Sequence, residues 1–236
     1  MRQCDRVLAT GGGAMVQAAY ASGTPALGVG VGNAVITVDA SADLDDAAEK
    51  IRISKTLDLA ASCSSDNSVL LIEEIYDEML ARLQQQGGYV CSADEKAKLQ
   101  ATLWADELHI NTAMVAQPVE RIASMAGIAP PEGTQFLIVL EDGFGPKHPF
   151  SGEKLSVIMA LYRATDIDHA IALTRNIQAY QGQGHSCGIY SNDDDNIMKL
   201  AASTHTSRVM VNQPQAASNS GNVWNGMRQT FSLGCG

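Results

Sequence analysis

The sequence predicts an α/β fold with a largely parallel sheet. Apolar runs of strand length alternate with amphipathic runs of helical length through most of the chain, as in proteins whose parallel strands are joined by helices. Hydrophobic residues make up 45% and charged residues 18% of the 236 positions, which is ordinary for a globular protein with a sizeable core. No fixed-period repeat interrupts this alternation, so a repeat architecture is not expected.

The first expected elements are a short strand, a glycine turn and a helix. Residues 6–9 form the strand, Thr10 to Gly13 form the turn, and residues 14–20 form a helix that Gly23 ends. Free N–H groups and the helix dipole point the same way at such a turn, which favours a nucleotide nearby. A tight turn explains these glycines about as well, because their spacing matches neither a G-x-G-x-x-G nor a Walker loop.

The later elements follow in chain order. In residues 28–33 glycine alternates with valine and asparagine, which places backbone without side chains along one face and suits close packing there. Residues 213–236 are rich in Gly, Asn and Ser and form either an ordered loop near a ligand or a frayed tail. The strands expected in between are 34–38, 69–72, 136–140, 155–164, 185–190 and 208–211, and the helices are 44–59, 76–83, a run capped by Ser92, 118–126, 165–180 and 193–203.

The charge balance bears on the class of partner. Lys and Arg number 16 against 26 Asp and Glu, for a formal net charge of −10, which argues against nucleic acid or an anionic membrane surface as the main partner. No apolar run approaches the roughly 20 residues needed to span a bilayer. The five cysteines have no paired spacing and no secretory signal precedes them, so we expect reduced thiols in a cytoplasmic protein.

The remaining ligand-type residues do not predict a metal site. The five histidines, His109, His148, His169, His185 and His205, lack the spacing of metal ligands. Asp193 to Asp195 lacks the alternating oxygen ligands of a calcium loop and is better explained as a solvated helix start. A G-x-S-x-G segment is also absent, so a serine hydrolase is not indicated.

Cys63 is the candidate nucleophile. It lies between an expected helix and an expected strand, among small hydroxyl residues that leave room for a substrate and free N–H groups to face an oxyanion. A buried structural thiol is the alternative, because free cysteine is among the most buried residue types. A thiolate can add to an aldehyde and, with a nicotinamide as hydride acceptor, give a thioester that remains activated for transfer.

Several segments carry a resemblance to a known family. They are LATGGGAMV at 8–16, PALGVGVGN at 25–33, SKTLD at 54–58 with the Cys63 segment, FSGEKLS at 150–156, GHSC at 184–187 and LGCG at 233–236. In this order they resemble the coenzyme-A-acylating branch of the aldehyde dehydrogenase superfamily, across nearly the whole chain. Val157 in place of a proline, and Asp66-Asn67 in place of Glu-Gln, depart from the family pattern.

The resemblance implies a reaction and a set of site residues. Cys63 would be the nucleophile, Glu153 would bind the ribose hydroxyls of NAD or NADP, and Thr10 and Gly11 would lie beside that cofactor. The substrate would be a small polar aldehyde such as sulfoacetaldehyde, with acetaldehyde and succinate semialdehyde left open, and coenzyme A would be the co-substrate. Hydrolytic relatives carry a water-activating glutamate in the segment that matches 28–32, whereas no carboxylate occurs there in this chain.

The resemblance also implies a division of the chain. Residues 1–35 would be a remnant of a Rossmann-like nucleotide-binding domain, 36–212 the catalytic domain, and 213–236 a truncated return segment toward the cofactor domain. We therefore expect a fragment of a longer protein that is a homo-oligomer when complete. Two alternatives stay open: a hydrolytic semialdehyde dehydrogenase that releases a free acid, and a non-catalytic fragment of such an enzyme.

Overall fold

The computed structural model describes residues 1–104, 109–222 and 225–230. Its centre is a parallel sheet with the strand order β5-β6-β7-β4-β3-β8-β9, so the predicted α/β class is confirmed. The strands of this sheet are β3 (Ala34–Val38), β4 (Asp66–Ile72), β5 (Gly88–Val90), β6 (Phe136–Leu140), β7 (Ile158–Ala164), β8 (Gly184–Tyr190) and β9 (Thr206–Val211).

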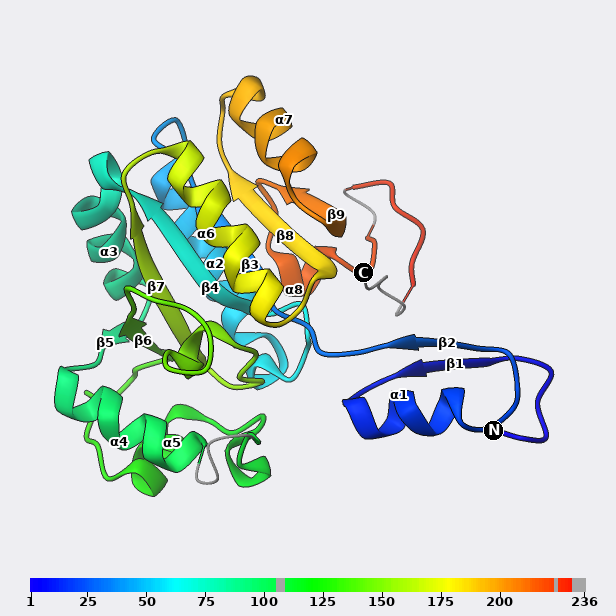
Figure 1. Ribbon diagram of the computed structural model, residues 1–236. Helices are drawn as coiled ribbons and strands as arrows, with labels where there is room; N and C mark the ends of the chain where they lie inside the picture. The colour runs from blue at the N-terminus through cyan, green and yellow to red at the C-terminus, as the bar shows by residue number, and fades with distance from the viewer. Residues whose placement is uncertain (105–108, 223–224, 231–236) are drawn as a thin grey trace.

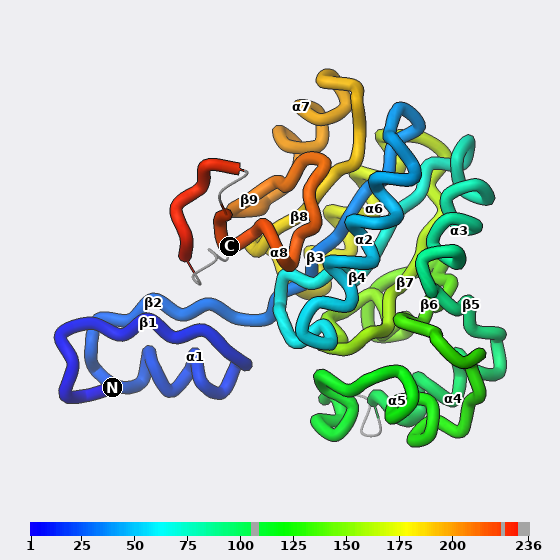
Figure 2. Tube along the Cα trace, turned by 180° about the vertical axis from the view of Figure 1, so that it is seen from behind, coloured from blue at the N-terminus to red at the C-terminus, as the bar shows by residue number. Residues whose placement is uncertain are grey.

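Helices cover both faces of the large sheet. α6 lies on one face, and α2 and α3 lie on the other (Figures 1 and 2). The helices are α2 (Leu44–Thr56), α3 (Tyr76–Gln85), α4 (Ala93–Leu103), α5 (Val119–Ala126), α6 (Ile167–Tyr180), α7 (Asp194–Ser203) and the short α8 (Gln215–Ser218). In the described part of the chain, no helix has the length and apolar character needed to cross a membrane.

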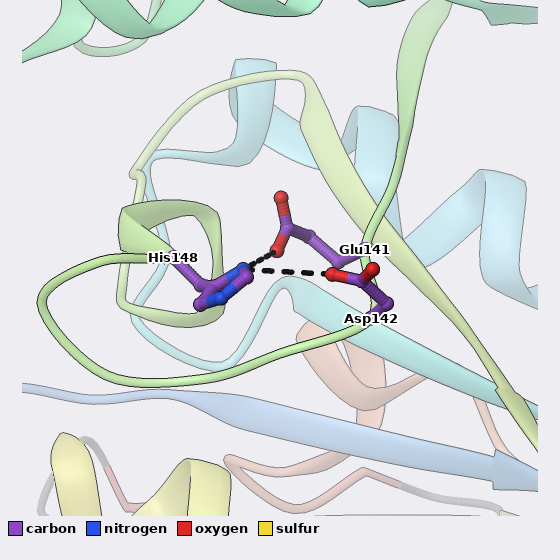
Figure 3. A group of neighbouring side chains, drawn as sticks. All are labelled: Glu141, Asp142 and His148. Carbon is purple, nitrogen blue, oxygen red and sulfur yellow. Dashed lines mark hydrogen bonds and ion pairs between the residues drawn. The ribbon is translucent and has the colours of Figure 1, made fainter.

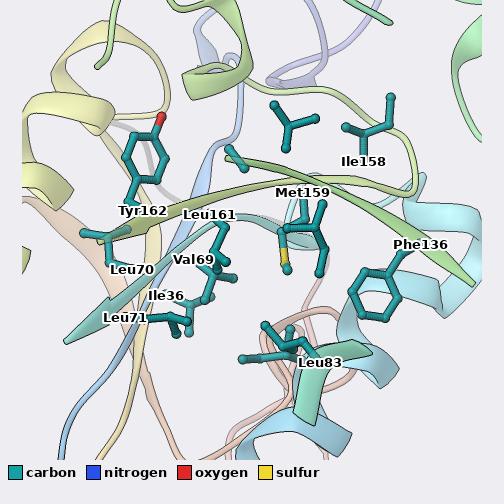
Figure 4. Close-up of a cluster of buried hydrophobic side chains, with 14 of the residues drawn as sticks. Ile36, Val69, Leu70, Leu71, Leu83, Phe136, Ile158, Met159, Leu161 and Tyr162 are labelled. Carbon is teal, nitrogen blue, oxygen red and sulfur yellow. The ribbon is translucent and has the colours of Figure 1, made fainter. Parts of the chain in front are cut away.

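The core lies against the central strands. Leu70, Leu71 and Leu161 are buried beside Phe136 and Leu83 (Figure 4). A parallel strand that is covered on both faces is apolar at consecutive positions, which explains the uninterrupted run Val69–Ile72 in β4.

The first part of the chain forms a second, smaller sheet. β1 (Val7–Thr10) and β2 (Ala26–Val29) pair in parallel and are joined by α1 (Gly13–Tyr20). This unit lies to one side of the large sheet, and the segment from β2 to β3 connects the two (Figures 1 and 2). β2 was not expected as a strand, because its glycine suggested a packing segment; the close approach of Val16 and Tyr20 from α1 to Gly28 explains that glycine.

Two expected boundaries were wrong. The strand expected at 155–164 begins only at Ile158, because Leu155 has a φ of 45° and residues Pro149–Ser151 form a 3-10 turn. The helix expected to reach Leu59 ends at Thr56. Left-handed backbone breaks the regular element in both places, and the apolar pattern of the side chains does not report it.

A left-handed turn leads into the Cys63 segment. Asp58, Leu59 and Ala60 have φ values of 50°, 52° and 59°. This conformation costs a non-glycine residue roughly 1–2 kcal/mol, and asparagine tolerates it better than leucine does. The turn is therefore a strained segment of the fold.

We expect Leu59→Asn to stabilise the protein by about 1 kcal/mol, because asparagine adopts left-handed backbone more readily. Leu57→Asn is the matched control, since Leu57 is similarly exposed but has a φ of −58°. Chemical denaturation measures both variants. An equal or larger gain in the Leu57 variant would contradict this account of the turn.

Candidate active site

The four residues predicted for the site line one pocket of about 360 Å³. Cys63 and Glu153 come from loops that precede β4 and β7, at the amino end of the large sheet. Thr10 and Gly11 come from the carboxyl end of β1 in the small sheet. The pocket thus lies between the two sheets, and ligand sites at the carboxyl ends of parallel strands are common.

Cys63 is half buried and faces a histidine. Its Sγ lies 3.2 Å from Nε2 of His185, at the start of β8. Burial, and then the negative charge of Glu153, raise the pKa of the Cys63 thiol. The thiol is therefore protonated at rest and needs a base to become a nucleophile.

His185 can serve as that base. Burial, with a contribution from the Arg208 charge, lowers the pKa of His185 to about 4, so the imidazole is neutral near pH 7. Its Nδ1 lies 2.9 Å from Ser186 Oγ. When Nδ1 carries the proton and donates it to this hydroxyl, Nε2 is an acceptor directed at Cys63.

His185 was missed as a site residue by the sequence reasoning. It was weighed there only as a metal ligand and as part of the GHSC segment. The residue lies 122 positions from Cys63 along the chain, and only the parallel pairing of the strands brings the two together. Its place in that family-like segment was the one available signal.

Glu153 is held from the glycine segment. The Gly32 N–H donates to Glu153 Oε1 at 3.1 Å, and the Glu153 N–H donates to Gln181 Oε1 at 3.0 Å. Burial raises the pKa of Glu153 to about 7. Among the described residues, none donates a hydrogen bond to the second oxygen of Glu153, which leaves this oxygen available as an acceptor.

Gly32 lies between the two functional groups. A Cβ at this position would lie 2.8 Å from both Cβ and the carbonyl oxygen of Cys63, and 3.0 Å from Glu153 Oε1. The alternating glycines therefore have a specific use here, because backbone without a side chain passes between nucleophile and carboxylate.

One group with metal-ligand chemistry lies away from this pocket. In the described ranges, Glu141, Asp142 and His148 are the cluster whose ligand atoms approach closely enough to share an ion (Figure 3). Lys96 forms an ion pair with the buried Glu141 and donates to the Leu140 carbonyl at 2.8 Å. The carboxylate thus already has a cation, and we read the cluster as an ion-pair network.

Part of the family-like sequence cannot be placed. The LGCG segment with Cys235 lies outside the described residues. Residues 213–222 include α8, whose Ala216 N–H donates to Ser54 Oγ at 3.0 Å. This contact ties the start of the expected return segment to α2, on the large sheet.

Comparisons with known proteins identify homologues of this chain. No family model matches the chain. The whole chain aligns at 44% identity with 48% of an acylating sulfoacetaldehyde dehydrogenase from Cupriavidus necator, and at 35% with 52% of an acetylating succinate-semialdehyde dehydrogenase from Clostridium kluyveri. The crystal structure of an acetylating aldehyde dehydrogenase from Geobacillus thermoglucosidasius has a TM-score of 0.94 at 35% identity, over 98% of this chain and 51% of that one.

The structure is an α/β fold with a cysteine in its pocket, and the proteins it resembles are dehydrogenases. Its homologues are acylating aldehyde dehydrogenases, so the resemblance that the sequence motifs predicted is confirmed. The chain spans about half the length of the curated relatives it matches.

We expect Gly32→Ala to destabilise the protein by about 1–3 kcal/mol, as overpacking does, and to slow alkylation of Cys63. Gly30→Ala is the matched control, because a Cβ at Gly30 meets nothing within 4 Å. Thermal melting and the rate of iodoacetamide labelling at Cys63 test the pair. Equal behaviour of the two variants would refute the close passage at Gly32.

Glu153→Gln should stabilise the protein at high pH only. The pKa of Glu153, about 7 in the fold, lies above the unfolded value near 4.3, so its contribution to stability is lost as pH rises through 7. The glutamine side chain does not ionise, so the stability of the variant does not fall in this way. We expect a gain on the order of 2 kcal/mol at pH 8 and little change at pH 4, measured by denaturant titration. A gain that does not depend on pH would contradict the shifted carboxyl.

Proposed function

We propose that this chain provides the nucleophile and acyl-transfer machinery of a coenzyme-A-acylating aldehyde dehydrogenase. The observation that carries the proposal is the contact of 3.2 Å between Cys63 Sγ and the neutral His185. Gly32, beside that pair, belongs to a segment without a carboxylate that could activate water, which favours a thiol as the acyl acceptor.

The first step is proton transfer and addition. His185 Nε2 takes the proton from Cys63, and the thiolate adds to the aldehyde carbon to give the thiohemiacetal as its oxyanion. Withdrawal of the sulfur proton at the moment of attack avoids a free thiolate beside Glu153, whose charge disfavours it. The histidine thereby offsets the raised pKa of the thiol.

The pocket fits a nicotinamide cofactor. Glu153 lines the pocket and offers its second oxygen as an acceptor for ribose hydroxyls, and Thr10 and Gly11 line the same space. When bound, NAD or NADP accepts the hydride that turns the thiohemiacetal on Cys63 into a thioester. Glu153 would orient the cofactor, and the backbone of Gly32 would keep that carboxylate in place.

The second half of the reaction is acyl transfer. His185 first releases to solvent the proton that it took from Cys63. The coenzyme A thiol then loses its proton to His185, and its sulfur attacks the Cys63 thioester. The Cys63–acyl bond breaks, and the thiolate of Cys63 takes back the proton from His185. The product is an acyl-coenzyme A, and both protein groups return to their starting state.

We propose a small polar aldehyde, with sulfoacetaldehyde as the first candidate, as the substrate. The acylating sulfoacetaldehyde dehydrogenase of Cupriavidus necator supports this choice at 44% identity. Ser62 and Ser64 beside Cys63 add hydroxyl groups close to the pocket, which suits a polar substrate. A cytoplasmic location, a homo-oligomeric complete protein and the division at 35 and 212 stay predictions.

The 236-residue chain tests the acyl-transfer half without any nicotinamide. Incubation with acetyl-coenzyme A should acylate Cys63, as read by intact mass and peptide mapping. Cys63→Ala should abolish the adduct, while the control Cys4→Ala, which removes an exposed thiol, should retain it. His185→Gln should slow acylation by about 100-fold, because it removes the base. An adduct that survives on Cys187 in the Cys63 variant would sink the assignment.

Aldehyde turnover by a protein that contains this chain shows whether coenzyme A or water is the acyl acceptor. Reduction of NAD(P)+ by sulfoacetaldehyde should require coenzyme A and should yield the acyl-coenzyme A. Release of free acid at the same rate without coenzyme A would reject the acylating assignment in favour of hydrolysis.

A further inference from the structure

A buried pair of amides joins the loop of Cys63 to the loop of Glu153. Asn67 is the second residue of β4, four positions after Cys63, and Asn33 follows Gly32 directly. Their side chains lie in the interior, with relative exposures of 4% and 0%. Neither lines the pocket, so neither touches substrate or cofactor.

The donor groups of both amides are fully used. Asn67 Nδ2 donates to the Gly152 carbonyl at 2.6 Å and to Asn33 Oδ1. Asn33 Nδ2 donates to the carbonyls of Ser151 at 2.8 Å and Gln181 at 3.1 Å. Each side-chain amide has two N–H groups, so all four hydrogens have an acceptor.

Those acceptors surround Glu153. Ser151 and Gly152 immediately precede it, and Gln181 accepts from its backbone N–H. Lys154, which follows Glu153 and is buried, donates to the Gly152 carbonyl at 3.0 Å. The backbone is thus held on both sides of the carboxylate by side chains from other elements or from the loop itself.

The network permits one arrangement. Turning either amide over would place its oxygen against a carbonyl oxygen, and burying such an unpaired polar group costs about 1–3 kcal/mol. A buried network whose donors are all satisfied favours a single geometry. The distance between the two loops is therefore set by hydrogen bonds, in addition to apolar packing.

We propose that Asn67 and Asn33 are positioning residues that fix the Glu153 loop relative to Cys63. The assignment of a catalytic purpose to this arrangement rests on the proposed function. Asn33 acts at two points, because its side chain holds Ser151 while the preceding Gly32 N–H holds the Glu153 carboxylate. Asn67, which follows the Cys63 loop, completes the link because its side chain donates a hydrogen bond to the Gly152 carbonyl.

The chemical reason for such a link lies in two opposing demands. Glu153 must reach the pocket to accept ribose hydroxyls, yet its charge disfavours the thiolate of Cys63. A loop that drifts would change both effects at once. The amide pair holds the carboxylate where it can bind the cofactor without preventing formation of the Cys63 thiolate.

The pH midpoint of Cys63 alkylation depends on the position of the Glu153 carboxylate relative to the thiol, so the pH profile measures this position. The titratable groups that act on the thiol are Glu153, whose charge raises its pKa, and His185, which contacts Sγ. Glu153→Gln should move the midpoint of the profile to lower pH. Asn67→Leu, which keeps the branching of the side chain but has no hydrogen-bonding groups, should release the loop and move the midpoint in the same direction.

A double-mutant cycle separates positioning from a direct effect on the Cys63 loop. If Asn67 acts through Glu153, Asn67→Leu should give no further shift in the Glu153→Gln background. An equal shift in both backgrounds would overturn the proposal. Asn67→Ala repeats the experiment with a smaller side chain, in case leucine prevents folding, and a folded Asn67 variant with the wild-type profile also overturns it.

Asn196→Leu is the control for loss of a hydrogen-bonded, partly buried amide. Asn196 donates to Asp39 Oδ2 at 3.1 Å, at the opposite end of the sheet. Its replacement by leucine should lower the melting temperature without moving the midpoint of the Cys63 alkylation profile. Iodoacetamide labelling needs no turnover. Failure of the acyl-transfer experiment would therefore count against the proposed function, and an unchanged labelling profile would count against the positioning role.

Discussion

The approach of the Gly32 backbone to Glu153 and Cys63 is the constraint on which the site depends. The Gly32 N–H holds the carboxylate at 3.1 Å, while the missing side chain leaves room for the nucleophile. The same stretch connects the small sheet to the large one, through β2 and β3. A few residues of extended chain therefore place the Thr10 turn, the carboxylate and the thiol around one pocket.

Burial of ionisable groups is the energetic cost of this arrangement. Glu153 lines the pocket and the adjacent Lys154 lies in the interior, and burial raises the pKa of the first and lowers that of the second. Burial likewise raises the pKa of Asp66, at the start of β4, and lowers that of Lys55 in α2. Burial of ionisable groups lowers stability unless they are paired, and the apolar core around β4 offsets this loss.

The sequence predicted the regular elements of the fold well where one physical signal decided them. The apolar run Val69–Ile72 is a central strand because it is covered on both faces, and the Ser92 capping pattern does begin α4. It failed where backbone conformation decided. Leu155 and Leu59 continue an apolar pattern but have left-handed backbone, and no hydrophobic period encodes that.

For the site, the sequence by itself determined which residues carry familiar chemistry. Cys63 and Glu153 were predicted as site residues because each lies in a short, contiguous sequence motif. The absence of a carboxylate in residues 28–32 is likewise visible in one short segment. Only the tertiary structure decided what surrounds them. His185 at Cys63 Sγ, and the pairing of Asn33 with Asn67, join residues 122 and 34 positions apart. Such contacts depend on the order and register of strands, which a single sequence does not encode in any local pattern.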